Sequence, residues 1–130
     1  MTFAPIAPEI EAVGKIVVDA GFRVRSTLGP GLLESAYEHC LAYELDSRGC
    51  GVGRQVALPI VYGAVKLDAG CRLDLLVAGA IVIEVKSVEA LAPVHQAQLL
   101  TYLKLSGHRL GFLMNFNVAL FKHGLRRFVL

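Results

Sequence analysis

Hydrophobic residues recur every three or four positions near the start of the chain, and this spacing is typical of an amphipathic helix. The positions that carry the pattern are Ile10, Val13, Ile16, Val17 and Ala20. We expect this helix to begin at Pro8, which the first turn tolerates, and to run to about Arg25. A glycine-proline break at residues 28–31 follows, and a second helix is predicted over residues 32–48, ending at Gly49.

From Gln55 onward the pattern changes to short, β-rich pieces. The predicted strands cover residues 56–62, 71–77, 81–88, 110–116 and 126–129, and residues 93–106 return to a helical pattern. Pro59 interrupts the first strand and therefore predicts that it lies at a sheet edge. The resulting order, α-α-β-β-β-α-β-β, indicates a mixed sheet packed by helices.

Length and composition narrow the class of protein. The chain has 130 residues and shows no internal repeat or linker, which indicates one domain over residues 1–130. Hydrophobic residues make up 55%, which excludes intrinsic disorder. Charged residues make up only 18%, against about 25% in typical soluble domains. So few charges cover a small surface poorly, and we therefore expect self-association, as in a homodimer.

Charge and targeting signals add little about partners. A net charge of +2 permits nucleic acid as a partner without demanding it. No apolar run reaches the roughly 18 residues of a membrane span, and residues 1–5 lack the features of a secretory signal. The cysteines, Cys40, Cys50 and Cys71, are odd in number and lack the spacing of a zinc site. Reduced thiols in a cytoplasmic protein are the expectation.

The strand Ile81-Val82-Ile83-Glu84-Val85-Lys86 carries the first candidate chemistry. Because side chains alternate along a strand, Glu84 and Lys86 share one face with Val82. Two charges in so apolar a strand are costly unless a site uses them. One interpretation is an edge strand with a surface ion pair; the other is a metal ligand beside a lysine that handles water or a phosphate oxygen.

The preceding strand offers a partner for Glu84. If residues 78–80 form a three-residue loop with Gly79 in the left-handed conformation, Val77 faces Ile81 and Asp74 lies opposite Glu84. Two facing carboxylates repel unless a cation lies between them, and Mg²⁺ prefers such oxygen ligands. A two-residue turn would shift the register by one and remove this pairing.

Two helices add polar candidates. Gly31, Glu34 and Tyr37 follow at three-residue intervals along one face of the predicted second helix, and Gly31 would let its backbone approach the sheet. Taken alone, Glu34 also matches an ordinary acid in the first turn of a helix, where its charge complements the helix dipole. On the third helix His95, Gln98 and Tyr102 share a face, which is either functional or an ordinary polar surface.

Several of these segments resemble one family. Residues 31–37, GLLESAY, are similar to the signature of the GxxExxY family, a branch of the PD-(D/E)XK nuclease superfamily, and residues 28–31, LGPG, resemble its entry. The other matching segments are Arg72-Leu73-Asp74-Leu75 (R-x-D-L), Glu84-Val85-Lys86 (E-x-K), the Q-x-x-x-Y helix over residues 93–104 and the strand over residues 110–116. The resemblance covers residues 10–130; Arg25 stands where many relatives carry His, outside the acidic cluster.

The resemblance implies a restriction-endonuclease-like core, a central mixed β-sheet flanked by helices, and metal-dependent hydrolysis of nucleic acid, with DNA favoured over RNA. It implies that Asp74 and Glu84 hold Mg²⁺ or Mn²⁺ with the Val85 carbonyl and waters, and that Glu34 adds a ligand directly or through water. Lys86 would orient the attacking water or stabilise phosphate charge, while Gln98 and Tyr102 position the nucleophile or the strand backbone. The alternatives are a non-catalytic nucleic-acid-binding or protein-interaction module with the same fold, and a purely structural subunit.

Overall fold

A computed structural model describes residues 4–130. Residues 1–3 belong to the stretch in which the sequence predicts no secretory signal, and they lie outside the described residues. Within the described part of the chain, no helix is both long enough and apolar enough to cross a membrane.

The order of helices and strands follows the prediction, with one additional 3₁₀ helix. The elements are α1 (Pro8–Leu28), α2 (Glu34–Ser47), β1 (Val52–Tyr62), β2 (Val65–Val77), β3 (Ile81–Lys86), α3 (Pro93–Ser106), β4 (Leu110–Asn115), η1 (Phe121–His123) and β5 (Leu125–Val129). The strands form one sheet in the order β1-β2-β3-β4-β5. Only β3 and β4 run parallel, and the other neighbours are antiparallel. The mixed sheet flanked by helices is consistent with the restriction-endonuclease-like core.

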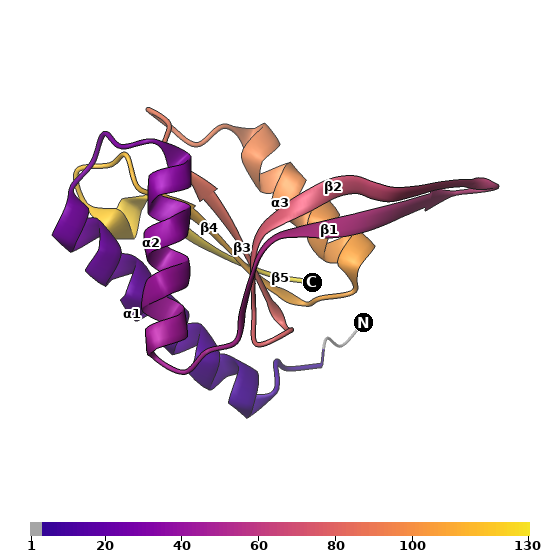
Figure 1. The fold of residues 1–130 in the computed structure, drawn as a ribbon, viewed down its shortest axis with the longest axis horizontal. Coiled ribbons are helices and arrows are strands. Elements are labelled where there is room, and N and C mark those ends of the chain that lie inside the picture. Colours follow the sequence, from indigo (N-terminus) through magenta and orange to yellow (C-terminus); the bar gives the residue numbers. More distant parts are fainter. Residues whose placement is uncertain (1–3) are drawn as a thin grey trace.

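Helices cover both faces of the sheet, with α1 and α2 on one side and α3 on the other (Figure 1). The central strand β3 divides its side chains between these layers. Ile81, Ile83 and Val85 pack in the core under α1 and α2. Val82 instead packs with Leu99 and Leu103 of α3. The predicted alternation along β3 is therefore confirmed, and it directs Glu84 and Lys86 toward the α3 layer.

The loop before α2 differs from the prediction. The helix begins at Glu34 rather than residue 32, because Gly29 and Gly31 have positive φ values of 77° and 93°. The Tyr37 hydroxyl fixes this loop by donating to the Gly29 carbonyl (2.6 Å) and accepting from the Leu32 amide (3.1 Å). Gly31 thus lies outside the helix, and a Cβ there would touch nothing within 4 Å. The predictions of a shared helix face and of a close approach to the sheet at Gly31 were wrong.

Strands β1 and β2 are longer than predicted and extend from the body as an arm (residues 59–70; Figure 1). β1 begins at Val52 instead of residue 56, and β2 at Val65 instead of residue 71. Residues 65–70 were missed because Asp68, Ala69 and Gly70 disfavour a strand locally, whereas pairing with β1 stabilises it. Pro59 lies at a register shift in the edge strand, as its missing N–H requires.

The remaining boundaries shift by a few residues. β3 ends at Lys86 instead of residue 88, and β4 ends at Asn115 instead of residue 116. The Asn115 side chain explains the first difference, since its Oδ1 accepts from the Val88 amide (3.1 Å) and its Nδ2 donates to the Val88 carbonyl (3.0 Å). A side-chain amide therefore replaces strand pairing beyond Lys86.

Two buried glycines of α1 test how closely this helix packs. A Cβ on Gly21 would lie 2.9 Å from Phe121 Cε2, whereas one on Gly14 would make an ordinary contact of 3.5 Å with Leu110 Cδ2. We expect Gly21→Ala to lower the free energy of unfolding by about 1–3 kcal/mol through overpacking. Gly14→Ala should raise it by up to about 1 kcal/mol through helix propensity. Urea unfolding measures both, and equal stabilisation by the two substitutions would contradict the described packing.

Candidate active site

The β2–β3 hairpin adopts the predicted register. Val77 pairs with Ile81, Leu76 with Val82 and Leu75 with Ile83. The three-residue loop has Gly79 in the left-handed region (φ 63°), as expected, and also Ala78 (φ 53°), which the sequence did not indicate. Strand pairing ends at Leu75 and Ile83, one step before Asp74 and Glu84.

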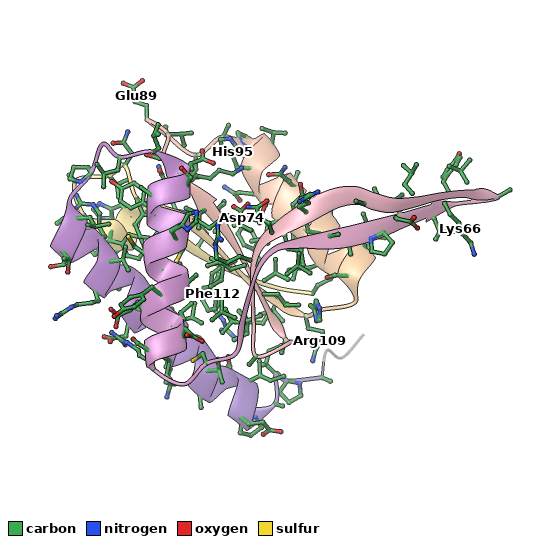
Figure 2. The ribbon with its side chains drawn as sticks, viewed as in Figure 1. Lys66, Asp74, Glu89, His95, Arg109 and Phe112 are labelled. Atoms are coloured by element: carbon green, nitrogen blue, oxygen red, sulfur yellow. The ribbon has the colours of Figure 1, made fainter. Side chains whose placement is uncertain are left out.

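Beyond that step the two acidic side chains replace the strand ladder. The Asp74 amide donates to Glu84 Oε2 (2.9 Å), and the Val85 amide donates to Asp74 Oδ2 (2.8 Å). Each carboxylate therefore binds the backbone of the opposite strand. The strands part at this point, at the base of the arm, where Figure 2 shows Asp74. The geometry brings Asp74 and Glu84 together, as the register predicts.

Burial makes it costly for both acids to be ionised together. Glu84 is only 3% exposed, and burial raises its pKa to about 8, with repulsion from the Asp74 carboxylate adding to the shift. Burial also raises the pKa of Asp74, although the bond from the Val85 amide opposes the shift. Lys86 favours the ionised form of both groups. Near neutral pH the pair therefore tends to retain a proton unless a cation lies nearby.

Lys86 is held by α3. Its Nζ donates to Gln98 Oε1 (3.2 Å), and Gln98 Nε2 donates to the Tyr102 hydroxyl (2.9 Å). Burial is the main cause that raises the pKa of Tyr102. A cavity of about 440 Å³ opens beside this chain, lined by Lys86, Val94, His95, Ala97, Gln98 and Thr101. The structure thus brings Lys86, Gln98 and Tyr102 into one hydrogen-bonded row.

His95 and Glu34 have other contacts. His95 Nδ1 accepts a hydrogen bond from the Ala92 amide (2.9 Å), which satisfies a donor at the start of α3. Glu34 is exposed at the first position of α2, and its Oε2 lies 3.4 Å from the Ser87 amide. Residues 4–130 contain no group of three His, Cys, Asp or Glu side chains placed to hold a metal. Glu34 therefore borders the site at Ser87 and does not join Asp74 and Glu84 in one cluster.

Glu38 belongs to the site although the sequence analysis did not single it out. It is 6% exposed, and its Oε1 accepts from Gln55 Nε2 (2.5 Å) while its Oε2 accepts from Arg54 Nη2 (2.9 Å). Gln55 Nε2 also reaches Asp74 Oδ1 (3.4 Å). The spacing of four residues from Glu34, which places both acids on one helix face, is the signal that was available.

The oxygen atoms of Asp74 and Glu84 are of the type that a divalent cation binds. Carboxylate oxygens are hard ligands, and the single hydrogen bonds that the Asp74 and Glu84 oxygens accept leave further lone pairs. A cation between these groups would relieve the repulsion that raises their pKa values. Two converging carboxylates and the adjacent Val85 carbonyl are thus the candidate ligands.

The raised pKa of Glu84 predicts how metal-free stability depends on pH. A folded pKa of about 8, against an ordinary 4.5, gives stability that is complete below pH 4.5 and is lost as pH rises through 8. In EDTA at pH 8, Glu84→Gln should unfold at a Tm higher than wild type by about 4 °C or more, equivalent to about 1 kcal/mol. The gap should close near pH 4.5, as thermal unfolding followed by circular dichroism would show.

Exposed Glu34 provides the matched control for that comparison, because Glu34→Gln removes a carboxylate without removing a buried charge. Its Tm should follow the wild-type dependence on pH. If the Glu84→Gln curve also runs parallel to wild type, Glu84 does not carry the buried charge described above.

Comparison with known proteins places these features in a family. The sequence profile of the PD-(D/E)XK nuclease superfamily matches residues 11–128, which is nearly the whole chain. No curated protein and no solved structure shows significant similarity. The matched range contains the mixed sheet, the paired acids on β2 and β3, and the lysine that follows them. The chain belongs to the PD-(D/E)XK nuclease superfamily.

Proposed function

We propose that residues 1–130 form a single metal-dependent nuclease domain of the GxxExxY branch. Members of the superfamily generally hydrolyse phosphodiester bonds, which supports the reaction class. The observation that carries the proposal is the reciprocal bonding of Asp74 and Glu84, with Lys86 two residues further along the same face of β3. This combination supports a site in which one substrate group meets paired carboxylates and an amine.

The proposed metal is Mg²⁺ or Mn²⁺, with Asp74, Glu84 and the Val85 carbonyl as ligands. Glu34, bound at Ser87, would contribute through a water molecule. When bound, the cation supplies Lewis-acid polarisation of the phosphodiester and acidifies the attacking water.

The protein side chains supply charge and orientation. The Lys86 amine is held by Gln98 and faces the cavity beside α3, where it would orient the attacking water or stabilise charge on a phosphate oxygen. Gln98 in turn donates to the Tyr102 hydroxyl, which leaves the hydroxyl proton free for a second acceptor. We propose that this row positions the nucleophile or the strand backbone in the cavity.

The proposed substrate is nucleic acid, and the family resemblance favours DNA over RNA. Of the basic residues that the chain offers for phosphate contacts, Arg72 and Lys104 are exposed on the elements that carry Asp74 and Gln98. Arg127 is paired with Glu11 (2.8 Å), and Arg126 binds backbone carbonyls near its own strand. Arg72 and Lys104 are therefore the better candidates for binding the strand.

The cysteines support a location in the cytoplasm, which we propose as part of this function. Cys40, Cys50 and Cys71 are all free, and Cys50 is buried. Free thiols persist where the compartment is reducing, as it is in the cytoplasm.

A non-catalytic nucleic-acid-binding or protein-interaction module is the second candidate. The observation that favours it is that Asp74 and Glu84 each already bind a backbone amide and have raised pKa values. A shared proton could therefore satisfy the pair without any metal. Calorimetry with Mn²⁺ separates the candidates, since the module would retain nucleic acid without binding the cation.

The nuclease proposal is tested by incubating the protein with Mn²⁺ and a panel of DNA and RNA oligonucleotides. Wild type should cut at least one member of the panel, and Asp74→Ala and Lys86→Ala should each lower the rate by about 100-fold or more. Lys15→Ala, an exposed lysine of α1, is the matched control and should cut at the wild-type rate. Wild-type cutting by the Asp74→Ala and Lys86→Ala variants would refute the assigned roles.

The arm supports the expected self-association. Tyr62 pairs with Val65 and Ile60 with Leu67, so four apolar side chains share one face of a two-stranded ribbon. Tyr62, Val65 and Leu67 are 82%, 54% and 50% exposed. An isolated ribbon of this kind is marginally stable, and an exposed apolar face marks an interaction surface.

We propose that the occupant of this face is a second copy of the chain. The two charged residues near the tip, Lys66 and Asp68, have opposite signs, so the tip is neutral and suits a like surface better than a phosphate backbone. Figure 2 shows Lys66 near the far end of the arm. A twofold arrangement is the commonest way for identical surfaces to meet.

Light scattering after gel filtration tests the homodimer. Wild type should have the mass of a dimer, and Tyr62→Asp should have that of a monomer because the charge is placed on the apolar face. Tyr43, which is 75% exposed on α2, gives the matched control, and Tyr43→Asp should remain dimeric. A monomeric wild type, or equal masses for the two variants, would rule out the arm as the interface.

A further inference from the structure

Glu38 is a buried acid that reaches the site from the α1–α2 layer of the sheet. Both of its oxygens are occupied by consecutive residues of β1, Arg54 and Gln55, at 2.9 Å and 2.5 Å. The carboxylate is 6% exposed, and acids are rarely so buried unless they are paired. The Arg54 guanidinium provides the pairing charge, and a carboxylate accepts hydrogen bonds but does not donate them.

Gln55 has an unusual backbone conformation at this point. Its φ is 50°, in the left-handed region that non-glycine residues rarely adopt. Its neighbours remain in the sheet, since Arg54 pairs with Leu75 and Val56 with Leu73, but Gln55 and Asp74 are absent from the pairing. A residue persists in such a conformation where its surroundings over-determine it.

The Gln55 amide joins the two acids. One nitrogen, Nε2, lies 2.5 Å from Glu38 Oε1 and 3.4 Å from Asp74 Oδ1. An amide nitrogen has two hydrogens, which is one for each carboxylate. If the amide were turned over, its oxygen would face both carboxylates and repel them. The Glu38 carboxylate, paired with Arg54, therefore selects the orientation that presents N–H to Asp74.

Asp74 is consequently bound at both oxygens. The Val85 amide donates to Oδ2 from β3, and the Gln55 amide donates to Oδ1 from β1. We propose that Glu38 is a positioning residue for Asp74, acting through the side-chain amide of Gln55. The proposal rests on the function proposed above only in that Asp74 is a metal-binding acid; the hydrogen-bond relay itself exists without metal.

The relay is tested first in the metal-free protein, by nuclear magnetic resonance of the Gln55 side-chain amide. Asp74→Ala should move one of the two Gln55 proton resonances, and Glu38→Gln should move both. Glu44→Gln is the matched control, because Glu44 also lies on α2 and pairs with an arginine, Arg48 (2.8 Å). It should move neither resonance, and unmoved resonances in Glu38→Gln would overturn the relay whether or not the protein is a nuclease.

Calorimetry with Mn²⁺ alone then tests the effect on Asp74. Glu38→Gln should weaken Mn²⁺ binding by about 10-fold or more, the loss expected when a residue that orients a ligand is removed. If Glu38→Gln does not fold, Gln55→Asn takes its place. Asparagine tolerates a φ of 50°, and its side chain is one methylene shorter than that of glutamine, so this variant should weaken Mn²⁺ binding to a similar extent. In turnover, kcat should fall with KM unchanged.

The outcomes separate the two proposals. If wild type binds Mn²⁺ and both Glu38→Gln and Gln55→Asn bind it with the same affinity, the positioning role is overturned and the nuclease function still stands. A wild type that does not bind Mn²⁺ would overturn the metal-dependent function and the positioning role toward metal, while the resonance measurements would still establish or refute the relay.

Discussion

Reciprocal bonding between Asp74 and Glu84 is the constraint on which the site depends. Two antiparallel strands stop pairing after Leu75 and Ile83, and the next two backbone donors would be unsatisfied in the interior. The carboxylates of these strands accept both bonds, at 2.9 Å and 2.8 Å. The same feature thus ends the ladder, satisfies the backbone and holds two acids together against their repulsion.

The surrounding layers extend this pair in two directions. From the α3 layer, Gln98 holds the Lys86 amine, and from the α2 layer, Glu38 reaches Asp74 through Gln55. The groups that hold Lys86 and Asp74 therefore come from opposite sides of the sheet. Helices and strands carry most of these side chains, so the relative positions of the side chains are determined by packing in the two cores.

Local patterns were enough to predict the central part of the site. Alternation along β3 and the length of the Ala78-Gly79-Ala80 loop determine on which face Glu84 lies and which residue it meets, and both depend on neighbours in the sequence. Gln98 and Tyr102 follow from helical spacing. Together with the order of elements, these features gave the fold and the acid pair.

The features that were missed depend on side-chain and strand contacts that the periodic spacing of residues does not encode. The Tyr37 hydroxyl delays the start of α2 by binding a loop that precedes it, and the first six residues of β2 are strand only because β1 lies beside them. Glu38 becomes part of the site through Gln55, 17 residues away. Spacing alone gives no measure of how these segments meet.

The arm projects from the body, so its sequence is under different constraints from the sequence that forms the two cores and the acid pair. From Pro59 to Gly70, the side chains are exposed apart from the half-buried Ile60, so they contribute little to the two cores. Evolution can therefore alter the length and surface chemistry of this segment while the acids and the lysine stay in place. Changes in what this surface binds should accordingly concentrate in this hairpin, and the packing that holds the acid pair should be unaffected.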